Sequence, residues 1–170
     1  MPIQVRRALF AAVLLSWLPS ALPAATIILV RHAERGSAMT SDVPISSVGE
    51  ERAVVLSQVL RDTGIQRIFV TALLRTRQTA APIAIRLHLE PVVIPPDDTD
   101  ALVSQLRALK EDETALVVGH SDTVPLIIER LGGGKIASIA DSEYDRLIVV
   151  VTNLSGKGKV VTLRYGKSTQ

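Results

Sequence analysis

Short apolar segments alternate with longer segments of helical spacing from residue 26 onward. We expect strands at residues 26–30, 65–70, 91–94, 115–119, 147–151 and 160–163, and helices at residues 47–61, 74–87, 99–109 and 124–131. An alternation of strand and helix gives a mostly parallel sheet with helices on both faces. The predicted fold is therefore α/β, a three-layer αβα sandwich. Gly64 should end the first helix, Pro82 should kink the second or start a new turn, and the turn at residues 156–158 should make the last two strands a hairpin.

Residues 1–24 have the pattern of a signal peptide. Two arginines at residues 6–7 precede an apolar run at residues 8–18, which is shorter than a membrane span needs. A proline and small residues follow, so we expect cleavage after Ala24, with an uncleaved anchor as the alternative. Residues 25–170 would then form one domain, periplasmic or secreted, with no stable membrane insertion.

Charge and cysteine content exclude several function classes. The chain has 19 Lys and Arg against 17 Asp and Glu, and residues 1–24 hold two of the arginines, so the remainder carries 17 of each sign. No basic patch remains that would indicate a nucleic-acid partner. The chain has no cysteine, which excludes disulfides, cysteine nucleophiles and thiolate metal ligands.

Basic side chains follow three of the predicted strands. Arg31 and His32 come after the first, Arg75 opens the helix after the second, and His120 follows the fourth. Ligands of parallel sheets bind at the carboxyl ends of the strands, so we expect these four side chains to converge. The alternative is that each of them is an ordinary surface residue. The third histidine, His88, lies in a helix-to-strand turn, and we expect it to have a structural role.

Such a cluster suits phosphoryl transfer. The planar fork of arginine matches phosphate oxygens, and a neutral imidazole is a nucleophile near pH 7. Arginines and a second imidazole would neutralise charge in the transition state. We expect no metal and no cofactor.

The segments LVRHAE, SDVPISSVGEERA, TALLRTRQTA and LVVGHSDTVP together resemble the histidine phosphatase superfamily, which includes phosphoglycerate mutases and phosphohistidine phosphatases. The resemblance covers residues 27–151 and implies a phosphoglycerate mutase-like fold. It implies that His32 is the nucleophile, with its other ring nitrogen donating to a backbone carbonyl. It also implies that Arg31, Arg75 and His120 bind phosphate, and it leaves Arg77 as a surface charge.

We expect other positions of these motifs to serve in packing, and some of them differ from the residues that are common in the family. Residues 78–80 read as helix packing, and Gly49 as a close backbone contact. Ala33, Arg35 and Ala38 stand where the family often has glycine, threonine and asparagine. The insertions that build a phosphoglycerate pocket are absent, which disfavours a mutase and favours a small phosphohistidine phosphatase-like member.

An alkoxide leaving group needs a proton, typically from a carboxylic acid. Family members usually supply it from the loop after the third strand, so we expect Asp97 or Asp98 to be the donor. The alternatives are that Asp98 caps the next helix, or that Asp122, beside His120, is the donor.

The sequence therefore predicts an exported, metal-independent phosphatase that forms a phosphohistidine intermediate. Its substrate would be a small phosphomonoester or a phosphohistidine. Two alternatives stay open: a phosphatase of envelope lipopolysaccharide sugars, which the leader favours, and a non-catalytic phosphate-binding module.

Overall fold

The computed structural model describes residues 24–40, 42–153 and 157–169. The predicted signal peptide, apart from Ala24, lies outside the described residues, and so does Gly156 of the predicted turn at residues 156–158. In chain order the elements are β1 (Ala24–Arg31), α1 (Ser47–Val59), β2 (Ile65–Thr71), α2 (Leu74–Leu87), β3 (Val92–Ile94), α3 (Thr99–Arg107), β4 (Thr114–Gly119), α4 (Thr123–Ile128), the π-helical turn η1 (Glu129–Gly133), β5 (Arg146–Asn153) and β6 (Gly158–Arg164).

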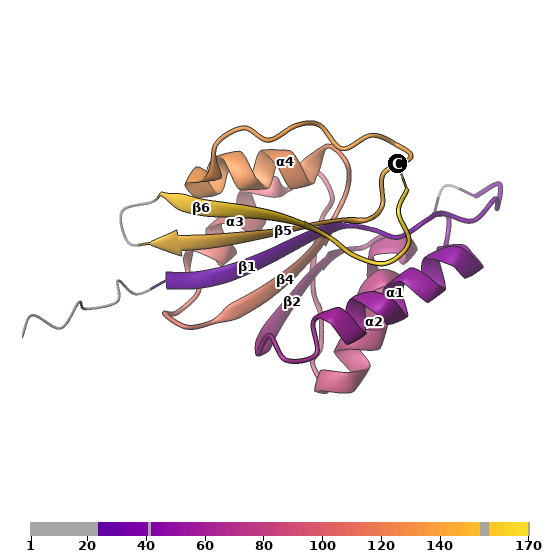
Figure 1. Ribbon diagram of the computed structural model, residues 1–170, viewed down its shortest axis with the longest axis horizontal. Helices are drawn as coiled ribbons and strands as arrows, with labels where there is room; N and C mark the ends of the chain where they lie inside the picture. The colour runs from indigo at the N-terminus through magenta and orange to yellow at the C-terminus, as the bar shows by residue number, and fades with distance from the viewer. Residues whose placement is uncertain (1–23, 41, 154–156, 170) are drawn as a thin grey trace, which may run out of the picture.

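The six strands form one sheet in the order β3-β2-β4-β1-β5-β6. Figure 1 shows the part of this order from β2 to β6. Strands β3, β2, β4 and β1 pair in parallel, whereas β5 pairs antiparallel with both β1 and β6. The mostly parallel sheet and the antiparallel pairing of the last two strands are therefore confirmed. Strand β1 lies near the centre of this order, with the parallel strand β4 on one side and the antiparallel strand β5 on the other.

Alternate residues of β1 point to opposite faces of the sheet, as strand geometry requires. Ile27 and Leu29 belong to one buried cluster, and Ile28 and Val30 belong to another. Both faces are buried, which is why this strand reads as a continuous apolar run.

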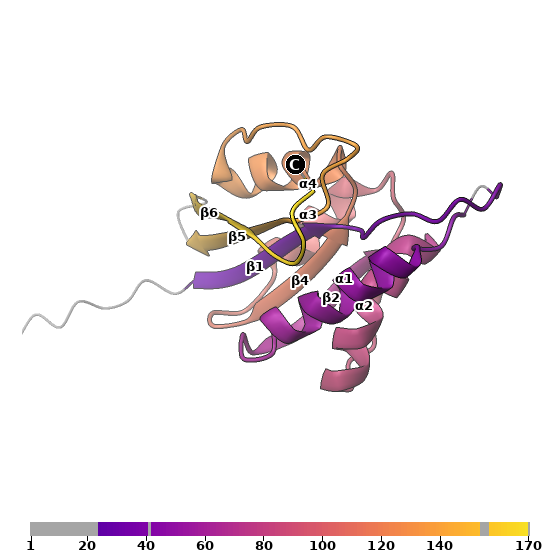
Figure 2. The same ribbon diagram turned by 45° about the vertical axis from the view of Figure 1, so that its right-hand side comes forward.

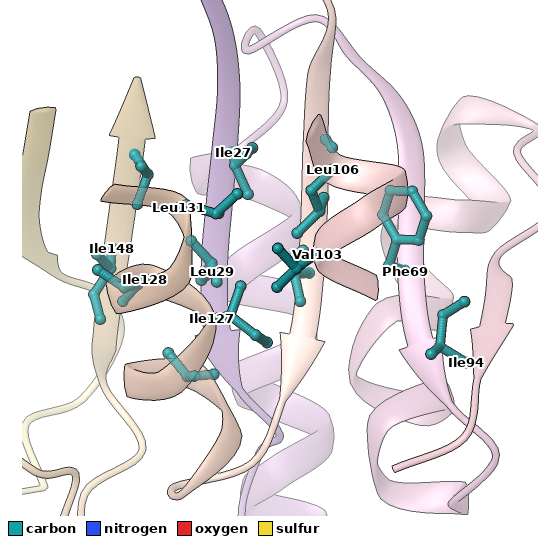
Figure 3. Packing of buried hydrophobic residues seen from close by; sticks show 14 of the residues in the cluster. Ile27, Leu29, Phe69, Ile94, Val103, Leu106, Ile127, Ile128, Leu131 and Ile148 are labelled. Carbon is teal, nitrogen blue, oxygen red and sulfur yellow. The ribbon is translucent and has the colours of Figure 1, made fainter. Parts of the chain in front are cut away.

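Helices cover both faces of the sheet (Figures 1 and 2). Leu56 of α1 and Ile83 of α2 pack in the cluster with Ile28. Val103 of α3 and Ile127 of α4 pack in the other cluster, over the face that Figure 3 shows. The three-layer architecture is thus the predicted one.

The first helix begins at a Ser46 cap, whose hydroxyl accepts a hydrogen bond from the Gly49 amide at 3.2 Å. A Cβ on Gly49 would lie 2.5 Å from the carbonyl oxygen of Glu34, so only glycine lets α1 approach the chain that follows β1 this closely. The expected close backbone contact at Gly49 is confirmed.

Two helices differ from their predicted form. Pro82 lies inside α2, which continues to Leu87 as one helix. The predicted helix over residues 124–131 is instead α4 followed by η1, which contains Gly132 at φ 80°. A Cβ on Gly133 would lie 2.6 Å from a methyl of Val160, so close packing against β6 shapes this end. In the part of the chain that the structure describes, no helix has the length and apolar character to cross a membrane.

Candidate active site

The carboxyl ends of β1 and β4 lie side by side and bring two histidines together. Arg31 is in register with Gly119, and the His32 amide donates to the Gly119 carbonyl at 2.9 Å. The next residue after Gly119 is His120. The ring centroids of His32 and His120 are 5.4 Å apart.

A cavity of about 420 Å³ opens at this edge of the sheet. The four predicted site residues line it, and so do residues of five loops. The lining residues are Arg31, His32, Arg35, Leu73, Arg75, Pro96, His120, Ser121, Asp122, Thr123 and Asp141. The three strand ends that the sequence predicts to converge are therefore brought together.

His32 presents one free ring nitrogen. Its Nδ1 lies 2.7 Å from the carbonyl oxygen of Ala33, an acceptor, so Nδ1 carries the proton and Nε2 keeps its lone pair. Burial lowers the pKa of His32 to about 3, helped by the charges of Arg31 and Arg75 and by His120, and opposed by the Ala33 contact. The ring is therefore neutral at pH 7.

His120 is also held neutral. Burial lowers its pKa to about 4, with help from the positive charges of Arg75 and Arg31, and the carboxylate of Asp122 opposes this. Its Nε2 lies 3.3 Å from the hydroxyl of Thr71, and its backbone amide donates to Thr123.

Arg31 is held by backbone acceptors. Its Nη1 donates to the carbonyls of Ala140, Asp141 and Glu143, at 2.7, 2.9 and 3.1 Å. Its guanidinium lies 4.2 Å from the ring centroid of Tyr144, and its Nη2 lies 3.6 Å from the Asp141 carboxylate. The guanidinium is therefore fixed before any ligand arrives.

Arg75 is held quite differently. Its guanidinium lines the cavity and makes no hydrogen bond or ion pair to the described residues, and its Nε is buried without an acceptor. Burial lowers its pKa, as do the charges of Arg35 and Arg31, whereas Asp42 raises it. Arg77, two residues on, is exposed as expected. Among the described residues, the Arg75 guanidinium therefore has no hydrogen-bond or ion-pair partner, and it can bind an anionic ligand in the cavity.

Gln78 and Thr79, which the sequence analysis assigned to helix packing, also hold the loop that follows β1. The Thr79 hydroxyl accepts from the Ala33 amide, and the Gln78 side chain accepts from the Ile45 amide, both at 2.9 Å. The helix that carries Arg75 therefore also fixes the backbone beside His32.

Sequence reasoning missed the support on the other side of Arg31. Glu143 is buried and forms ion pairs with Arg146 and Arg164, each at 2.7 Å. Burial raises the pKa of Glu143, but its hydrogen bonds to Arg146 and Arg164 and the charge of Arg146 outweigh burial, so the pKa is lowered. The run of acidic residues just before β5 was the one available signal.

A second missed ion pair lies beside His32. The buried Arg52 donates from Nε to both carboxylate oxygens of Glu34, at 2.9 Å. It also donates to the carbonyls of Tyr165 and Lys167. The C-terminal segment is therefore tied to the loop that follows the nucleophile candidate.

The structure places neither Asp97 nor Asp98 in the lining of the cavity. Asp97 is exposed, and the Asp98 carboxylate caps α3 by accepting from the Ala101 amide at 2.9 Å. The capping alternative for Asp98 is thus the one observed. The carboxylates that do line the cavity, among the described residues, are Asp122 and Asp141.

No group of three or more metal-ligating His, Asp or Glu side chains occurs in residues 24–40, 42–153 and 157–169. The charged groups of the cavity are mainly cationic, which suits an oxyanion rather than a metal ion.

Comparisons with known proteins agree with this geometry. Residues 27–97 match the family model of the histidine phosphatase superfamily, branch 1. A comparison with curated proteins gives no match.

Solved structures share the fold at low sequence identity. The protein histidine phosphatase SixA complexed with tungstate has a TM-score of 0.69 at 20% identity, covering 82% of this chain and 96% of its own. A putative phosphohistidine phosphatase SixA from Nakamurella multipartitia has a TM-score of 0.61 at 23% identity, covering 87% and 99%. A mycobacterial glucosyl-3-phosphoglycerate phosphatase complexed with VO3 has a TM-score of 0.66 at 15% identity, covering 83% and 99%.

Proposed function

We propose that this chain, whose residues 27–97 match the family model of the histidine phosphatase superfamily, branch 1, is a phosphatase that hydrolyses a phosphomonoester or a phosphohistidine through a phosphohistidine intermediate on Nε2 of His32. One observation carries the proposal. The neutral His32 ring, with its proton on Nδ1, lines a cavity in which the Arg75 guanidinium has no partner among the described residues. Phosphoryl transfer needs a nucleophile and, beside it, a positive charge that can bind the phosphate oxygens.

The reaction has two steps that balance. In the first, the Nε2 lone pair attacks phosphorus, and the bond to the leaving oxygen or nitrogen breaks with its electron pair. In the second, water attacks phosphorus, the electron pair of the N–P bond returns to Nε2, and inorganic phosphate leaves with both protons of the water. Arg75 and His120 would hold the phosphate oxygens, and Arg31 would do so from its fixed position. Neither step requires a metal, and activity that survives excess EDTA would support a metal-independent enzyme.

The identity of the proton donor separates the two substrate classes. Asp122 and Asp141 line the cavity, so they are now the candidates to protonate an alkoxide, ahead of Asp97 and Asp98. A phosphohistidine leaving group can arrive already protonated and needs no such acid. The SixA neighbours are named for phosphohistidine, which favours that class.

Comparing Asp122→Asn and Asp141→Asn decides the point. The donor variant should slow an alkyl phosphate strongly and p-nitrophenyl phosphate little. If neither variant slows the alkyl phosphate more than p-nitrophenyl phosphate, neither aspartate is the proton donor that a phosphomonoester needs, and phosphohistidine is the better substrate.

The cellular location is proposed from the sequence of residues 1–24. Its basic, apolar and small-residue regions support export, with cleavage after Ala24 and a periplasmic or secreted enzyme. N-terminal sequencing of the chain recovered from its source tests this. In that location, phosphorylated lipopolysaccharide sugars are the alternative substrates to assay.

The central experiment is His32→Ala, with His88→Ala as its control. His88 is an exposed histidine at the end of α2. With a ³²P-labelled substrate, the wild type and His88→Ala should give a phosphoenzyme that survives an alkaline quench and is lost in acid. His32→Ala should give none. Activity of His32→Ala within about tenfold of wild type would overturn the assignment, because loss of a nucleophile costs far more. A chain that binds phosphate without turnover would instead be the binding module.

A further inference from the structure

A buried hydroxyl at the end of β2 touches the second histidine of the site. The Thr71 Oγ1 lies 3.3 Å from Nε2 of His120 and 2.9 Å from the Thr76 hydroxyl. It also accepts from the Leu73 amide at 3.4 Å. Thr71 and Thr76 are both buried. Neither residue carries a role in the phosphatase mechanism described above.

Each hydroxyl has one hydrogen, so the three groups form a chain with a direction. If Thr71 donates to Thr76, then Nε2 of His120 must donate to Thr71, and a neutral ring leaves Nδ1 without a proton. If Thr76 donates to Thr71, then Thr71 donates to Nε2, and the ring proton is on Nδ1. The geometry permits either direction. The Thr76 hydroxyl also lies 2.9 Å from the Leu73 carbonyl oxygen and 3.1 Å from the Thr71 carbonyl oxygen. When its hydrogen goes to one of these carbonyls, the Thr71 hydroxyl can donate either to Thr76 or to Nε2 of His120.

The use of His120 selects between the two directions. Nδ1 of His120 has no hydrogen-bond partner among the described residues, so it is the nitrogen left for a ligand. A neutral ring can donate to a phosphate oxygen from Nδ1 only if the proton is there. The low pKa of His120, about 4, agrees with a neutral ring at pH 7.

We propose that Thr71 is a positioning residue that donates its hydroxyl proton to Nε2 of His120 and thereby keeps the imidazole proton on Nδ1, where it can bind phosphate. The proposal rests on the phosphatase function proposed above. The two histidines of the site would then carry their protons on the same ring atom for opposite purposes. In His32 the Nδ1 proton frees Nε2 to attack, whereas in His120 it is the donor itself.

The test measures the tautomer directly. The chain has three histidines, so ¹⁵N-histidine labelling gives a simple two-bond ¹H–¹⁵N spectrum, assigned with His32→Gln and His88→Gln. At pH 7 and without ligand, wild-type His120 should show a protonated Nδ1. Thr71→Val removes the hydroxyl at nearly constant shape and should move the proton to Nε2, wholly or in part. Thr71→Ser should restore the wild-type spectrum.

Binding of inorganic phosphate gives the second readout. Thr71→Val should weaken it about tenfold, since one hydrogen bond to a charged group is lost, and Thr71→Ser should stay within about twofold of wild type. Thr152→Val is the matched control. Its hydroxyl lies 3.4 Å from the Ala25 carbonyl, near the opposite end of the sheet, and both readouts should be unchanged.

Two results would overturn the proposal: a protonated Nε2 on His120 in the wild type, or a tautomer that Thr71→Val leaves unchanged. Failure of the phosphatase function gives a different pattern. There, His120 would show the Nδ1 tautomer and respond to Thr71→Val, but neither phosphate binding nor turnover would be found. That pattern supports the hydrogen bond from Thr71 to His120 and rejects only the proposed role of His120 in binding phosphate.

Discussion

The two arginines of the candidate site are prepared for phosphate in different ways. Arg31 has its Nη1 bonded to backbone carbonyls and its plane against Tyr144, so it contributes a fixed positive charge. Arg75 has no partner among the described residues and is free to form a two-point contact with a phosphoryl group. The geometry of substrate binding should therefore depend more on Arg75 than its partly exposed position implies.

Replacing Arg75 by lysine should lower kcat/KM by about 10²- to 10³-fold, although the charge is kept. Lysine is a point charge and cannot make the planar two-point contact, and one preorganised donor is worth roughly this much. Arg77→Lys, on the same helix but exposed, is the control and should leave kcat/KM within about twofold. Steady-state kinetics with p-nitrophenyl phosphate measures both. An unchanged kcat/KM for Arg75→Lys would make Arg75 a surface residue only.

Site residues that directly follow a strand could be predicted from the sequence. Residues that reach the site through contacts between distant parts of the chain could not. His32, Arg75 and His120 follow strands, and parallel strand ends share an edge of the sheet. Arg52 and Glu143 could not be found in this way. Arg52 bonds to Tyr165, 113 residues away, and Glu143 accepts Arg31 at its carbonyl, 112 residues away.

At the scale of elements, the segment before β5 forms a clamp on the end of β1. Its carbonyls hold Arg31, and its buried Glu143 is held in turn by Arg146 and Arg164. The chain after β6 closes the same clamp, since Thr169 donates to the Asp145 carboxylate and accepts from the Tyr144 amide. Two segments with no proposed chemistry therefore determine where Arg31 lies.

Removing the Glu143 carboxylate should weaken this clamp. Glu143→Ala leaves Arg146, whose side chain is 10% exposed, without its buried partner, and should cost about 3 kcal/mol in the free energy of unfolding. Activity measured below the unfolding temperature should also fall, because the Glu143 carbonyl positions Arg31.

The control for this prediction is the ion pair of Asp100 with Arg130. The Asp100 side chain is 87% exposed, so Asp100→Ala should cost less than about 1 kcal/mol and leave activity alone. Thermal and urea unfolding measure both variants. If Glu143→Ala and Asp100→Ala lower the free energy of unfolding equally, the buried ion pairs of Glu143 stabilise the fold no more than an exposed ion pair does.

Secondary structure was predictable wherever local signals determine it. The apolar runs locate the strands, and α2 has the bounds that its spacing predicts. The end of α4 was not predictable, because the π-helical turn there depends on packing of Gly133 against Val160 of β6. The glycines of this turn can be read from the sequence, but the strand that packs against Gly133 cannot.

At the scale of the whole molecule, the site makes folding sensitive to acid. The pKa values of His32 and His120 are about 3 and 4 in the folded chain, against 6.5 for an unperturbed histidine. Below pH 6.5 the unfolded chain binds protons at these positions that the folded chain does not bind. Stability is therefore full above pH 6.5 and falls as the pH falls toward 4.

The slope should be at most about 1.4 kcal/mol per pH unit for each of the two rings. Urea unfolding at several pH values from 7.5 to 4.5 measures it. The double variant His32→Gln, His120→Gln should show a shallower fall over the same range, because the titrating rings are gone. A variant that loses stability as steeply as the wild type would assign the acid sensitivity to other groups.

The fold class was predictable at this scale, but the order of the strands was not. Alternation of strands and helices requires a mostly parallel layered sheet, and the turn signal before β6 predicts an antiparallel pair. Nothing in the local pattern places β1 between β4 and β5. That position depends on pairings between residues about 90 to 130 apart in the chain, such as Thr26 with Thr114 and Ala24 with Asn153.

The central position of β1 has a consequence for the timing of synthesis. His32 leaves the ribosome early, but the carbonyls that hold Arg31 belong to residues 140–143, and the chain that braces them ends at Thr169. A nascent polypeptide thus carries His32, the proposed nucleophile, for most of translation without the groups that hold Arg31 beside it. Contacts of such long range also form late in folding. We therefore expect the enzyme to be inactive until residues 140–169 have been made and have folded onto the end of β1.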